Sequence, residues 1–457
     1  MNRRTFNSFL AGGIASAEAR IPGISAADAQ IASPSADEDR RTAWYRNAKF
    51  GMFIHWGPYS VASVEASWPI MRPSKQFPIT EMEYRALPAR FNPAHFDPDA
   101  WVALAQSAGQ RYMVFTTKHH DGFCMFDSAF TNYKITNTPY GKDIVAQLAA
   151  AAHRAHMPIG FYYSPPDMNH PAYRDTSQPA SKNWHGEPTR EVWPLYLDYM
   201  KLQLRELLTR YGRAALIWFD GLDNQRKYDG YRMARIINNC QPDTLMNNRI
   251  GITGDFETPE QFIPSSIPVK GSTLDFDHRK TGTKPGYVPP PQDFQLWETC
   301  MTINNTWAYN KNDRHFKSVK ELVRTLIKVA SKGGNFLLDV GPEPDGTIQP
   351  EFQERLRAMG KWLRANGEAI YGTTYGPLQT LTFGKTTRKG NNVYLEIFDW
   401  PSSGVLHVPG LSGKVRFVSL LNGNRTLHFH QAASALNVDL AGIQPDPYAT
   451  VLNLSME

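Results

Sequence analysis

Seven short apolar runs recur along the first three quarters of the chain, and none of them shows regular alternation with polar residues. Such runs are typical of parallel strands that are buried on both faces. Their ranges are 50–56, 112–117, 158–164, 215–220, 244–248, 294–299 and 336–340. We therefore expect these segments to form the strands of one parallel sheet.

Helical patterns fill the intervals between these runs. Asp97-Pro98 is typical of a helix start, because the Asp side chain caps the first turn and Pro fits the first helical position. Apolar residues recur at helical spacing over 192–211. Ser318 and Glu321 form a capping-box pattern that opens another helix. Strands that alternate with helices predict an α/β fold.

Polar residues at the ends of the strands distinguish a barrel from an open doubly wound sheet. The residues expected at or just past the C-terminal end of a strand are His55, His119, His120, Asp220, Arg249 and Glu298. In a barrel these ends converge on one mouth, where catalytic groups collect. We therefore predict an irregular (β/α)8 TIM-like barrel over residues 38–372. Its eighth strand has no clear apolar run.

The pattern changes in the last part of the chain. Short, partly alternating segments are separated by Gly, Asn and Pro turns, with no helical pattern between them. These segments are 393–398, 415–420, 427–430 and 450–454. They predict a C-terminal antiparallel β-sandwich over 373–457. Within the barrel part, the Pro/Gly-rich stretch 263–292 predicts a long loop of the kind that is usually functional or mobile.

The first residues resemble an export signal. Arg3-Arg4 precedes a mildly apolar stretch that is rich in Ala and Gly, and small-x-small cleavage sites follow it. We expect a twin-arginine signal peptide over 1–19 and a linker over 20–37, so the protein would be exported to the periplasm or secreted. No other segment of the sequence is typical of a membrane span.

Composition narrows the choice of function. Aromatic residues make up 12% of the chain, which fits a large core and also a sugar-binding cleft. The net charge is +6, but the basic residues are spread along the chain, so nucleic-acid binding is not expected. Cys124, Cys240 and Cys300 form no zinc pattern. Either one pair is oxidised or all three are free thiols.

Asp220-Gly221 ends the run Leu216-Ile-Trp-Phe and is the strongest chemical signal. An acid at the end of a buried strand is costly unless it faces a polar cavity or has partners. The chemical interpretation is a carboxylate nucleophile that forms a glycosyl-enzyme intermediate, and the alternative is an Asp that caps the next helix. Retention needs a second carboxyl group about 5–5.5 Å away. The candidates are Glu65, Glu257, Glu260 and Glu298.

His119 and His120 form the second signal. Adjacent residues on a strand point to opposite faces, which disfavours joint coordination of a metal. We therefore favour hydrogen bonds to sugar hydroxyls, because a neutral imidazole both donates and accepts. Metal binding and a satisfied core histidine are the alternatives. The sequence contains no nucleophile elbow and no phosphate-binding loop.

Several segments together resemble the α-L-fucosidases of glycoside hydrolase family 29. They include Phe50-Gly-Met-Phe-Ile-His55-Trp-Gly, Lys118-His-His-Asp-Gly-Phe123, Gly160-Phe-Tyr-Tyr-Ser164, Trp218-Phe-Asp220-Gly, Asn247-Asn-Arg249, Gly254-Asp-Phe-Glu-Thr-Pro-Glu260, Trp297-Glu-Thr-Cys-Met301 and Lys332-Gly-Gly-Asn-Phe-Leu-Leu-Asp-Val-Gly-Pro342. The resemblance runs in order from about residue 40 to 375. It implies a barrel with a C-terminal sandwich, and exo-hydrolysis of terminal α-L-fucose with retention. It also implies that neither a metal nor a cofactor is needed.

The resemblance also implies roles for single residues. Asp220 matches the nucleophile, and Glu260 matches the acid/base of some members, with Glu298 as the rival position; we favour Glu260. The implied fucose pocket contains His55, Glu65, Trp68, His119, His120, Tyr162, Trp218 and Arg249. The expected partner is a fucosylated glycan. Two other functions remain open: a catalytically silent fucose-binding protein, and a metal-dependent barrel hydrolase built on His119, His120 and Asp220.

Overall fold

The computed structural model describes residues 36–71, 79–173, 192–221, 228–271, 287–432 and 435–457. The expected signal peptide and nearly all of the expected linker lie outside the described residues, so export stays a prediction. Part of the expected loop, residues 272–286, also lies outside them. None of the described helices is both long enough and apolar enough to cross a membrane.

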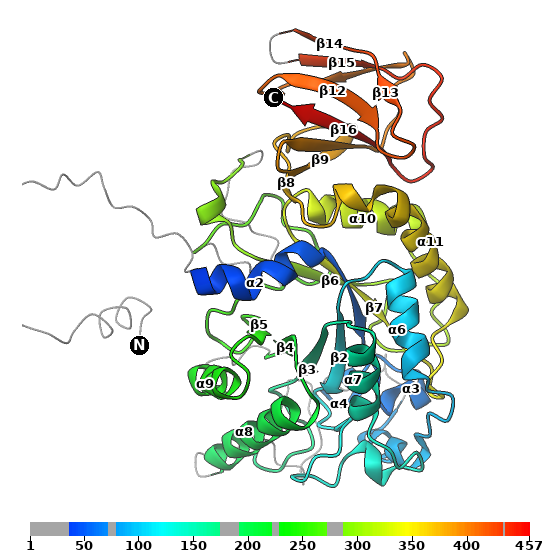
Figure 1. The fold of residues 1–457 in the computed structure, drawn as a ribbon. Helices are drawn as coiled ribbons and strands as arrows, with labels where there is room; N and C mark the ends of the chain where they lie inside the picture. Colours follow the sequence, from blue (N-terminus) through cyan, green and yellow to red (C-terminus); the bar gives the residue numbers. More distant parts are fainter. Residues whose placement is uncertain (1–35, 72–78, 174–191, 222–227, 272–286, 433–434) are drawn as a thin grey trace, which may run out of the picture.

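The core of the larger domain is a curved sheet of seven parallel strands (Figure 1). The strands are β1 Phe50–Ile54, β2 Met113–Lys118, β3 Ile159–Tyr163, β4 Leu216–Phe219, β5 Leu245–Met246, β6 Glu298–Thr302 and β7 Asn335–Val340. Their order across the sheet is β5-β4-β3-β2-β1-β7-β6. Every residue of β1, β2, β3, β4, β6 and β7 is buried, as the continuous apolar runs predict.

An irregular segment, residues 255–261, joins the two edge strands of this sheet. On one side Asp255 N–H donates to the carbonyl of Met246, at the end of β5 (2.7 Å). On the other side Gln261 N–H donates to the carbonyl of Cys300, in β6 (2.9 Å). Isolated parallel bridges link the segment to both edges. The segment occupies the place of the eighth strand and closes the barrel, so the prediction of an irregular TIM-like barrel is confirmed.

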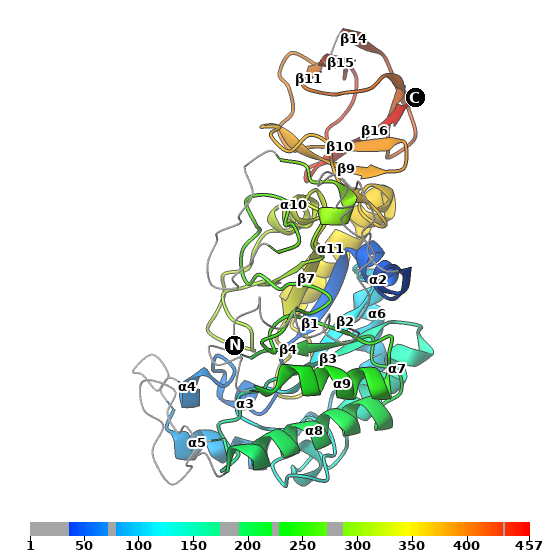
Figure 2. The same ribbon diagram turned by 90° about the vertical axis from the view of Figure 1, so that its left-hand side faces the viewer.

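Helices surround the barrel strands (Figures 1 and 2). The α-helices are α2 Ala36–Ala48, α3 Tyr59–Ala62, α4 Trp68–Met71, α5 Glu81–Arg85, α6 Pro98–Ser107, α7 Ile144–Arg154, α8 Trp193–Arg210, α9 Gly230–Cys240, α10 Val319–Ala330 and α11 Pro350–Asn366. The short 3-10 helices are η1 Leu87–Arg90, η2 Ile135–Asn137, η4 Pro291–Asp293 and η5 Gly367–Ala369. The Asp97 side chain caps α6, and Ser318 and Glu321 form the expected capping box of α10.

The prediction of 294–299 as a strand was wrong in position. The strand there, β6, begins at Glu298, so Glu298 lies at the N-terminal end of the barrel and not at its mouth. The apolar residue before it, Trp297, is buried but lies outside the strand. The Trp297 indole lies against Gly334, whose missing side chain leaves room for the ring, and its N–H donates to the carbonyl of Lys332 (3.1 Å).

The second domain is an antiparallel sandwich, as predicted. Its strands are β8 Thr374–Tyr375, β9 Gly384–Lys389, β10 Asn392–Ile397, β11 Val405–Val408, β12 Val415–Leu420, β13 Thr426–Leu427, β14 Phe429–Ala432, β15 Ala435–Asp439 and β16 Thr450–Met456. One sheet has the order β13-β12-β16-β10-β9-β8 and the other β11-β15-β14. Aliphatic side chains from both sheets form its core.

The sandwich packs on helices α10 and α11 (Figure 2). The Arg324 guanidinium, on α10, donates to the carbonyl of Tyr448 (3.0 Å) and lies 4.8 Å from the Phe398 ring centroid. The Trp362 indole, on α11, donates to the carbonyl of Ala449 (3.1 Å). All three cysteines of the chain are free thiols, which excludes the expected alternative of an oxidised pair in this structure.

Candidate active site

A pocket opens at the C-terminal ends of the barrel strands. Its lining residues are Phe53, His55, Trp68, His119, His120, Tyr162, Trp218, Asp220, Glu260, Cys300 and Trp307. Most of the residues expected at a strand end therefore come together here, because parallel strands deliver their C-terminal ends to one mouth. His55 follows β1, the two histidines follow β2, and Asp220 follows β4.

Three donors hold the Asp220 carboxylate. The Tyr162 hydroxyl donates to Oδ2 (2.8 Å) and the Arg249 guanidinium donates to Oδ1 (2.9 Å). The His120 Nε2 atom lies 3.4 Å from Oδ2. Burial alone would raise the pKa of Asp220, but the contact with His120, the charge of Arg249 and the Tyr162 hydrogen bond outweigh it and hold the pKa well below its usual range. Asp220 is therefore an ionised and oriented carboxylate.

Arg249 connects Asp220 with Glu260. The same guanidinium nitrogen, Nη1, lies 2.9 Å from Asp220 Oδ1 and 2.9 Å from Glu260 Oε2. These two carboxylate oxygens therefore lie at most twice 2.9 Å, or 5.8 Å, apart. Thr258 fixes the guanidinium by accepting from Nε at its hydroxyl and from Nη2 at its carbonyl, both at 2.8 Å. The arrangement places two carboxyl groups across a gap about as wide as retaining hydrolysis requires.

Glu260 reaches the pocket from the irregular segment that closes the barrel. Its backbone bridges to Cys300 of β6, and the next residue, Gln261, has a positive φ of 57°. The Glu260 side chain is 34% exposed, against 13% for Asp220. Of the two acids, Glu260 therefore has the easier access to water and to a departing group.

A stack of flat side chains forms one wall of the site. The Tyr162 ring is nearly parallel to the rings of Trp218 (centroids 5.6 Å apart) and His119 (5.5 Å). The Arg249 guanidinium lies over the Trp218 ring at 4.7 Å. Because the Tyr162 ring packs between the rings of Trp218 and His119, its hydroxyl points toward Asp220 in a fixed direction.

Buried partners orient the histidines. The Nδ1 atom of His55 lies 2.7 Å from Asp339 Oδ1. Burial lowers the pKa of His55 to about 3 and raises that of Asp339 well above its usual range, so the pair is held without net charge. The Nδ1 atom of His119 bonds the Ser67 hydroxyl, and burial lowers the pKa of His119 well below its usual range. Neutral rings can both accept from and donate to sugar hydroxyls.

His119, His120 and Asp220 also form the metal-binding geometry that the sequence left open, with one ligand atom of each within 4.8 Å of the others. Each Asp220 oxygen already has a hydrogen-bond donor, because Tyr162 bonds one and Arg249 the other. A cation bound to Asp220 would also lie close to the Arg249 charge. The surroundings of Asp220 therefore favour a carboxylate that acts without a metal.

Glu298 does not reach the pocket. It is fully buried and accepts hydrogen bonds from the Tyr112 hydroxyl and from the Trp218 indole N–H, the latter at 3.0 Å. Burial raises the pKa of Glu298 to about 7, although both hydrogen bonds oppose the rise. Its expected position at the mouth was wrong, because β6 starts at this residue. Glu298 therefore fixes the Trp218 ring by accepting its indole N–H.

Three further residues contribute to the site: Trp68, Trp307 and Glu65. Trp68 and Trp307 line the pocket, and the Trp307 ring packs on His55 with centroids 5.0 Å apart. Glu65 accepts the backbone N–H of Trp307 (2.9 Å), and among the described residues its second oxygen has no hydrogen-bond partner. Burial raises the pKa of Glu65 to about 8. Sequence reasoning missed Trp307, which follows an Asn-rich turn rather than an apolar run.

Known proteins resemble this chain over most of its length. The family model for α-L-fucosidase matches residues 22–368. The human tissue α-L-fucosidase is 30% identical over 405 residues, which cover 82% of this chain and 79% of that protein. α-L-Fucosidase isoenzyme 1 from Paenibacillus thiaminolyticus has a TM-score of 0.80 at 34% identity, covering 92% of this chain and 99% of that one.

A second solved structure extends the comparison. A family 29 α-L-fucosidase from Bacteroides thetaiotaomicron, trapped as a covalent intermediate with 2-fluoro-fucosyl fluoride, has a TM-score of 0.77 at 26% identity. The match covers 92% of this chain and 96% of that one. With the family model spanning most of the sequence, the chain belongs to the α-L-fucosidases of glycoside hydrolase family 29.

Proposed function

We propose that this α-L-fucosidase removes terminal α-L-fucose with retention at the anomeric carbon, with Asp220 as nucleophile and Glu260 as acid/base. One observation carries the proposal. A single nitrogen of Arg249 contacts both carboxylates, so their nearest oxygens lie within 5.8 Å, twice the 2.9 Å of each contact. A separation near 5–5.5 Å fits a double displacement, whereas inversion needs about 6.5–9.5 Å to admit a water molecule.

In the first step Asp220 Oδ attacks the anomeric carbon of fucose. The bond to the leaving oxygen breaks, and Glu260 gives that oxygen its proton. The products are a fucosyl ester on Asp220 and the free alcohol of the glycan. The trapped covalent intermediate of the Bacteroides relative supports this chemistry for the family fold.

In the second step water attacks the anomeric carbon, the bond from that carbon to Asp220 Oδ breaks, and Glu260 takes the proton from the water. Negative charge therefore moves from Asp220 to Glu260 during the first step and returns in the second. Arg249 touches both acids, so the guanidinium has an anionic partner throughout the cycle. This continuous pairing avoids an unpaired buried cation at any stage.

The remaining residues bind the sugar. His55, His119, His120 and Glu65 offer polar atoms for hydroxyl groups, and Trp68, Trp218 and Trp307 offer apolar surfaces for the flat face and methyl group of fucose. The small size of the pocket favours the removal of one terminal residue. The substrate is therefore a fucosylated glycan with the fucose at its end.

The test is Asp220→Gly assayed on an aryl α-L-fucoside. Turnover should fall by several orders of magnitude, as for loss of a nucleophile. Azide should restore part of the rate and give a fucosyl azide with inverted configuration, because the small anion occupies the space of the missing carboxylate. Near-normal turnover, or a rescued product with retained configuration, would refute the assignment.

A further inference from the structure

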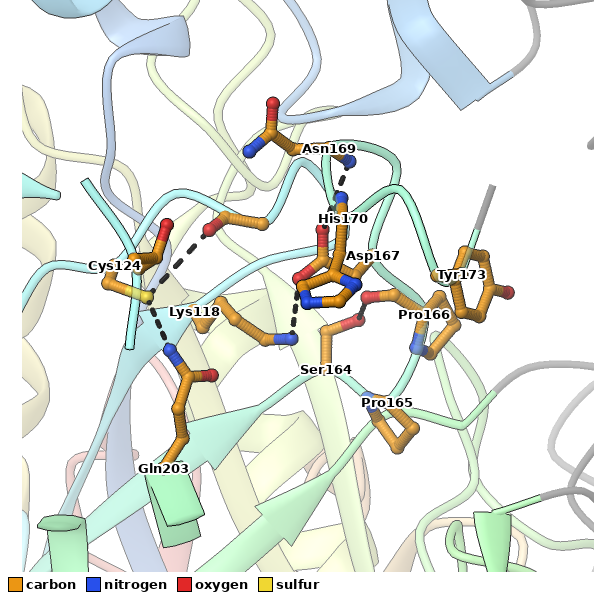
Figure 3. Close-up of polar contacts among 12 residues, drawn as sticks. Lys118, Cys124, Ser164, Pro165, Pro166, Asp167, Asn169, His170, Tyr173 and Gln203 are labelled. Atoms are coloured by element: carbon orange, nitrogen blue, oxygen red, sulfur yellow. Dashed lines mark hydrogen bonds and ion pairs between the residues drawn. The ribbon is translucent and has the colours of Figure 1, made fainter. Parts of the chain in front are cut away.

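A buried polar network lies behind His120 and outside the pocket. Lys118 ends β2, and Asp167 follows β3 in the loop after that strand. Lys118 Nζ lies 3.1 Å from Asp167 Oδ2, and both side chains are almost completely buried. Figure 3 shows the two side chains pointing toward one another. Burying both charges costs free energy, and this cost is offset only where the pair makes further hydrogen bonds to the chain around it.

The ion pair fixes the turn that follows β3. Asp167 Oδ1 accepts the backbone N–H groups of Asn169 (3.0 Å) and His170 (2.8 Å). The Tyr196 hydroxyl donates to the carbonyl of Pro165 and lies 3.4 Å from Lys118 Nζ. Both the Asp167 side chain and the backbone of the turn are therefore held by hydrogen bonds.

Ser164 connects this turn to the active site. Its hydroxyl donates to the carbonyl of Pro166 (2.7 Å) and lies 2.5 Å from Nδ1 of His120 (Figure 3 shows the first contact). A serine hydroxyl has one hydrogen, and a proline carbonyl can only accept. With that hydrogen committed to Pro166, the hydrogen of the second contact comes from His120 Nδ1. The Asp220 carboxylate can also only accept, so the contact of Nε2 with Asp220 Oδ2 needs a second hydrogen on the ring.

We propose that Ser164 is a positioning residue that holds a hydrogen on Nδ1 of His120 and fixes the direction of the ring, and that the Lys118–Asp167 ion pair holds the Pro166 carbonyl where it takes the Ser164 hydrogen. The inference rests on the proposed function, in which His120 contacts the nucleophile and the sugar. With Nδ1 committed to Ser164, Nε2 is the ring atom that faces Asp220 Oδ2 at 3.4 Å. Groups that orient a functional histidine in this way commonly change activity about 10–100-fold when removed.

The direct test detects which nitrogens of His120 carry a hydrogen, without substrate. Nitrogen-15 spectra of histidine-labelled enzyme would be recorded for the wild type, for Ser164→Ala, and for His120→Gln to assign the His120 signals. We expect hydrogens on both Nδ1 and Nε2 of His120 in the wild type, because Ser164 and Asp220 each accept one, and loss of the Nδ1 hydrogen in Ser164→Ala. Identical His120 signals in the wild type and Ser164→Ala would overturn the proposal, whatever the role of Asp220.

The kinetic test uses Ser164→Ala beside Ser331→Ala. Ser331 is also buried and also donates to a backbone carbonyl, that of Lys328 (2.9 Å), but it lies at the end of α10. We expect Ser164→Ala to lower kcat/KM about 10–100-fold at unchanged melting temperature. Ser331→Ala should keep its kcat/KM. Equal kcat/KM for the two variants would contradict the positioning role.

The role of the ion pair is tested by the double variant Lys118→Met/Asp167→Asn, which removes both charges and leaves neither unpaired. It should lower kcat/KM as Ser164→Ala does. Combined with Ser164→Ala, it should cause no further loss, because both changes act through the same His120 bond. Losses that multiply would show that the pair acts elsewhere and would overturn this part of the proposal.

Discussion

Asp220 and Glu260 have different surroundings although one guanidinium contacts both. Asp220 is buried among Tyr162, His120 and Arg249, whereas a third of the Glu260 side chain is exposed. A nucleophile must hold one direction, and an acid/base must exchange protons with water and with the leaving group. The unequal surroundings therefore match the two roles that we propose.

Glu260 and Glu298 can be separated by how their variants respond to the leaving group. Glu260→Ala should lose about 10²–10⁴-fold on glycans, but much less on fucosides of acidic phenols, which need no proton. Azide should speed this variant and give a product with retained configuration. Measured rates across a series of aryl fucosides, with product analysis, test this expectation.

The matched control is Glu298→Gln. The amide oxygen still accepts from the Trp218 indole, so we expect less than about a 10-fold loss of turnover, no dependence on the leaving group and no effect of azide. If azide rescued the Glu298 variant and left Glu260→Ala unchanged, the two assignments would have to be exchanged.

Glu65 makes stability depend on pH. Burial raises its pKa to about 8 in the folded protein, against about 4.3 in an unfolded chain. Between these values the unfolded chain releases this proton and the folded protein keeps it, so the contribution of Glu65 to stability falls as pH rises. It is fully present below about pH 4 and lost above about pH 8.

Gln does not titrate, so replacing Glu65 with Gln removes this pH-dependent contribution to stability. Glu65→Gln should therefore reduce the fall of the melting temperature between about pH 5 and pH 8. The melting temperature of the variant should exceed that of the wild type most near pH 8. Melting curves at closely spaced pH values measure this effect. Parallel curves for wild type and variant would mean that Glu65 is ionised in the folded protein.

Continuous apolar runs predicted the barrel strands because both faces of those strands are buried. The run before Glu298 misled the prediction, since Trp297 packs against Gly334 and precedes the first residue of β6. The sequence analysis missed strand β9 because it contains no apolar run, and half of its residues are exposed or partly exposed. Ser164 and Trp307 were missed as site residues because their role depends on contacts between distant segments.

The capping box of α10 predicts a measurable effect at the level of one helix. The Ser318 hydroxyl accepts from Glu321 N–H, and the Glu321 side chain accepts from Ser318 N–H. Ser318→Ala should lower the free energy of unfolding by about 1 kcal/mol, because a backbone donor of the first turn loses its partner. Ser318→Asp keeps a capping oxygen and should cost less. Thermal unfolding measures both, and activity should not change.

At the scale of the whole molecule, the barrel and the sandwich share a core. Tyr394, Ala449 and Val451 of the sandwich belong to the same buried cluster as the barrel residues, and Trp362 donates across the boundary. Separation of the domains would expose this apolar surface. Figure 2 shows the sandwich packed on α10 and α11 at one end of the molecule.

We therefore expect the two domains to unfold together. Calorimetry should show one transition, and Trp362→Phe, which lacks the indole N–H, should move that transition to lower temperature without splitting it. Two resolved transitions, with only the smaller one displaced by the variant, would contradict a shared core.

The irregular segment 255–261 has a consequence for how such an enzyme can change. Asp220 is tied to a regular strand, so moving it by one residue would turn a whole buried face outward. Glu260 lies in a stretch that is paired by isolated bridges only, and the Pro/Gly-rich sequence 263–292 follows it. Insertions beside it can therefore relocate the proton donor and reshape the space for the aglycone. The sugar pocket and the attacking group would stay in place.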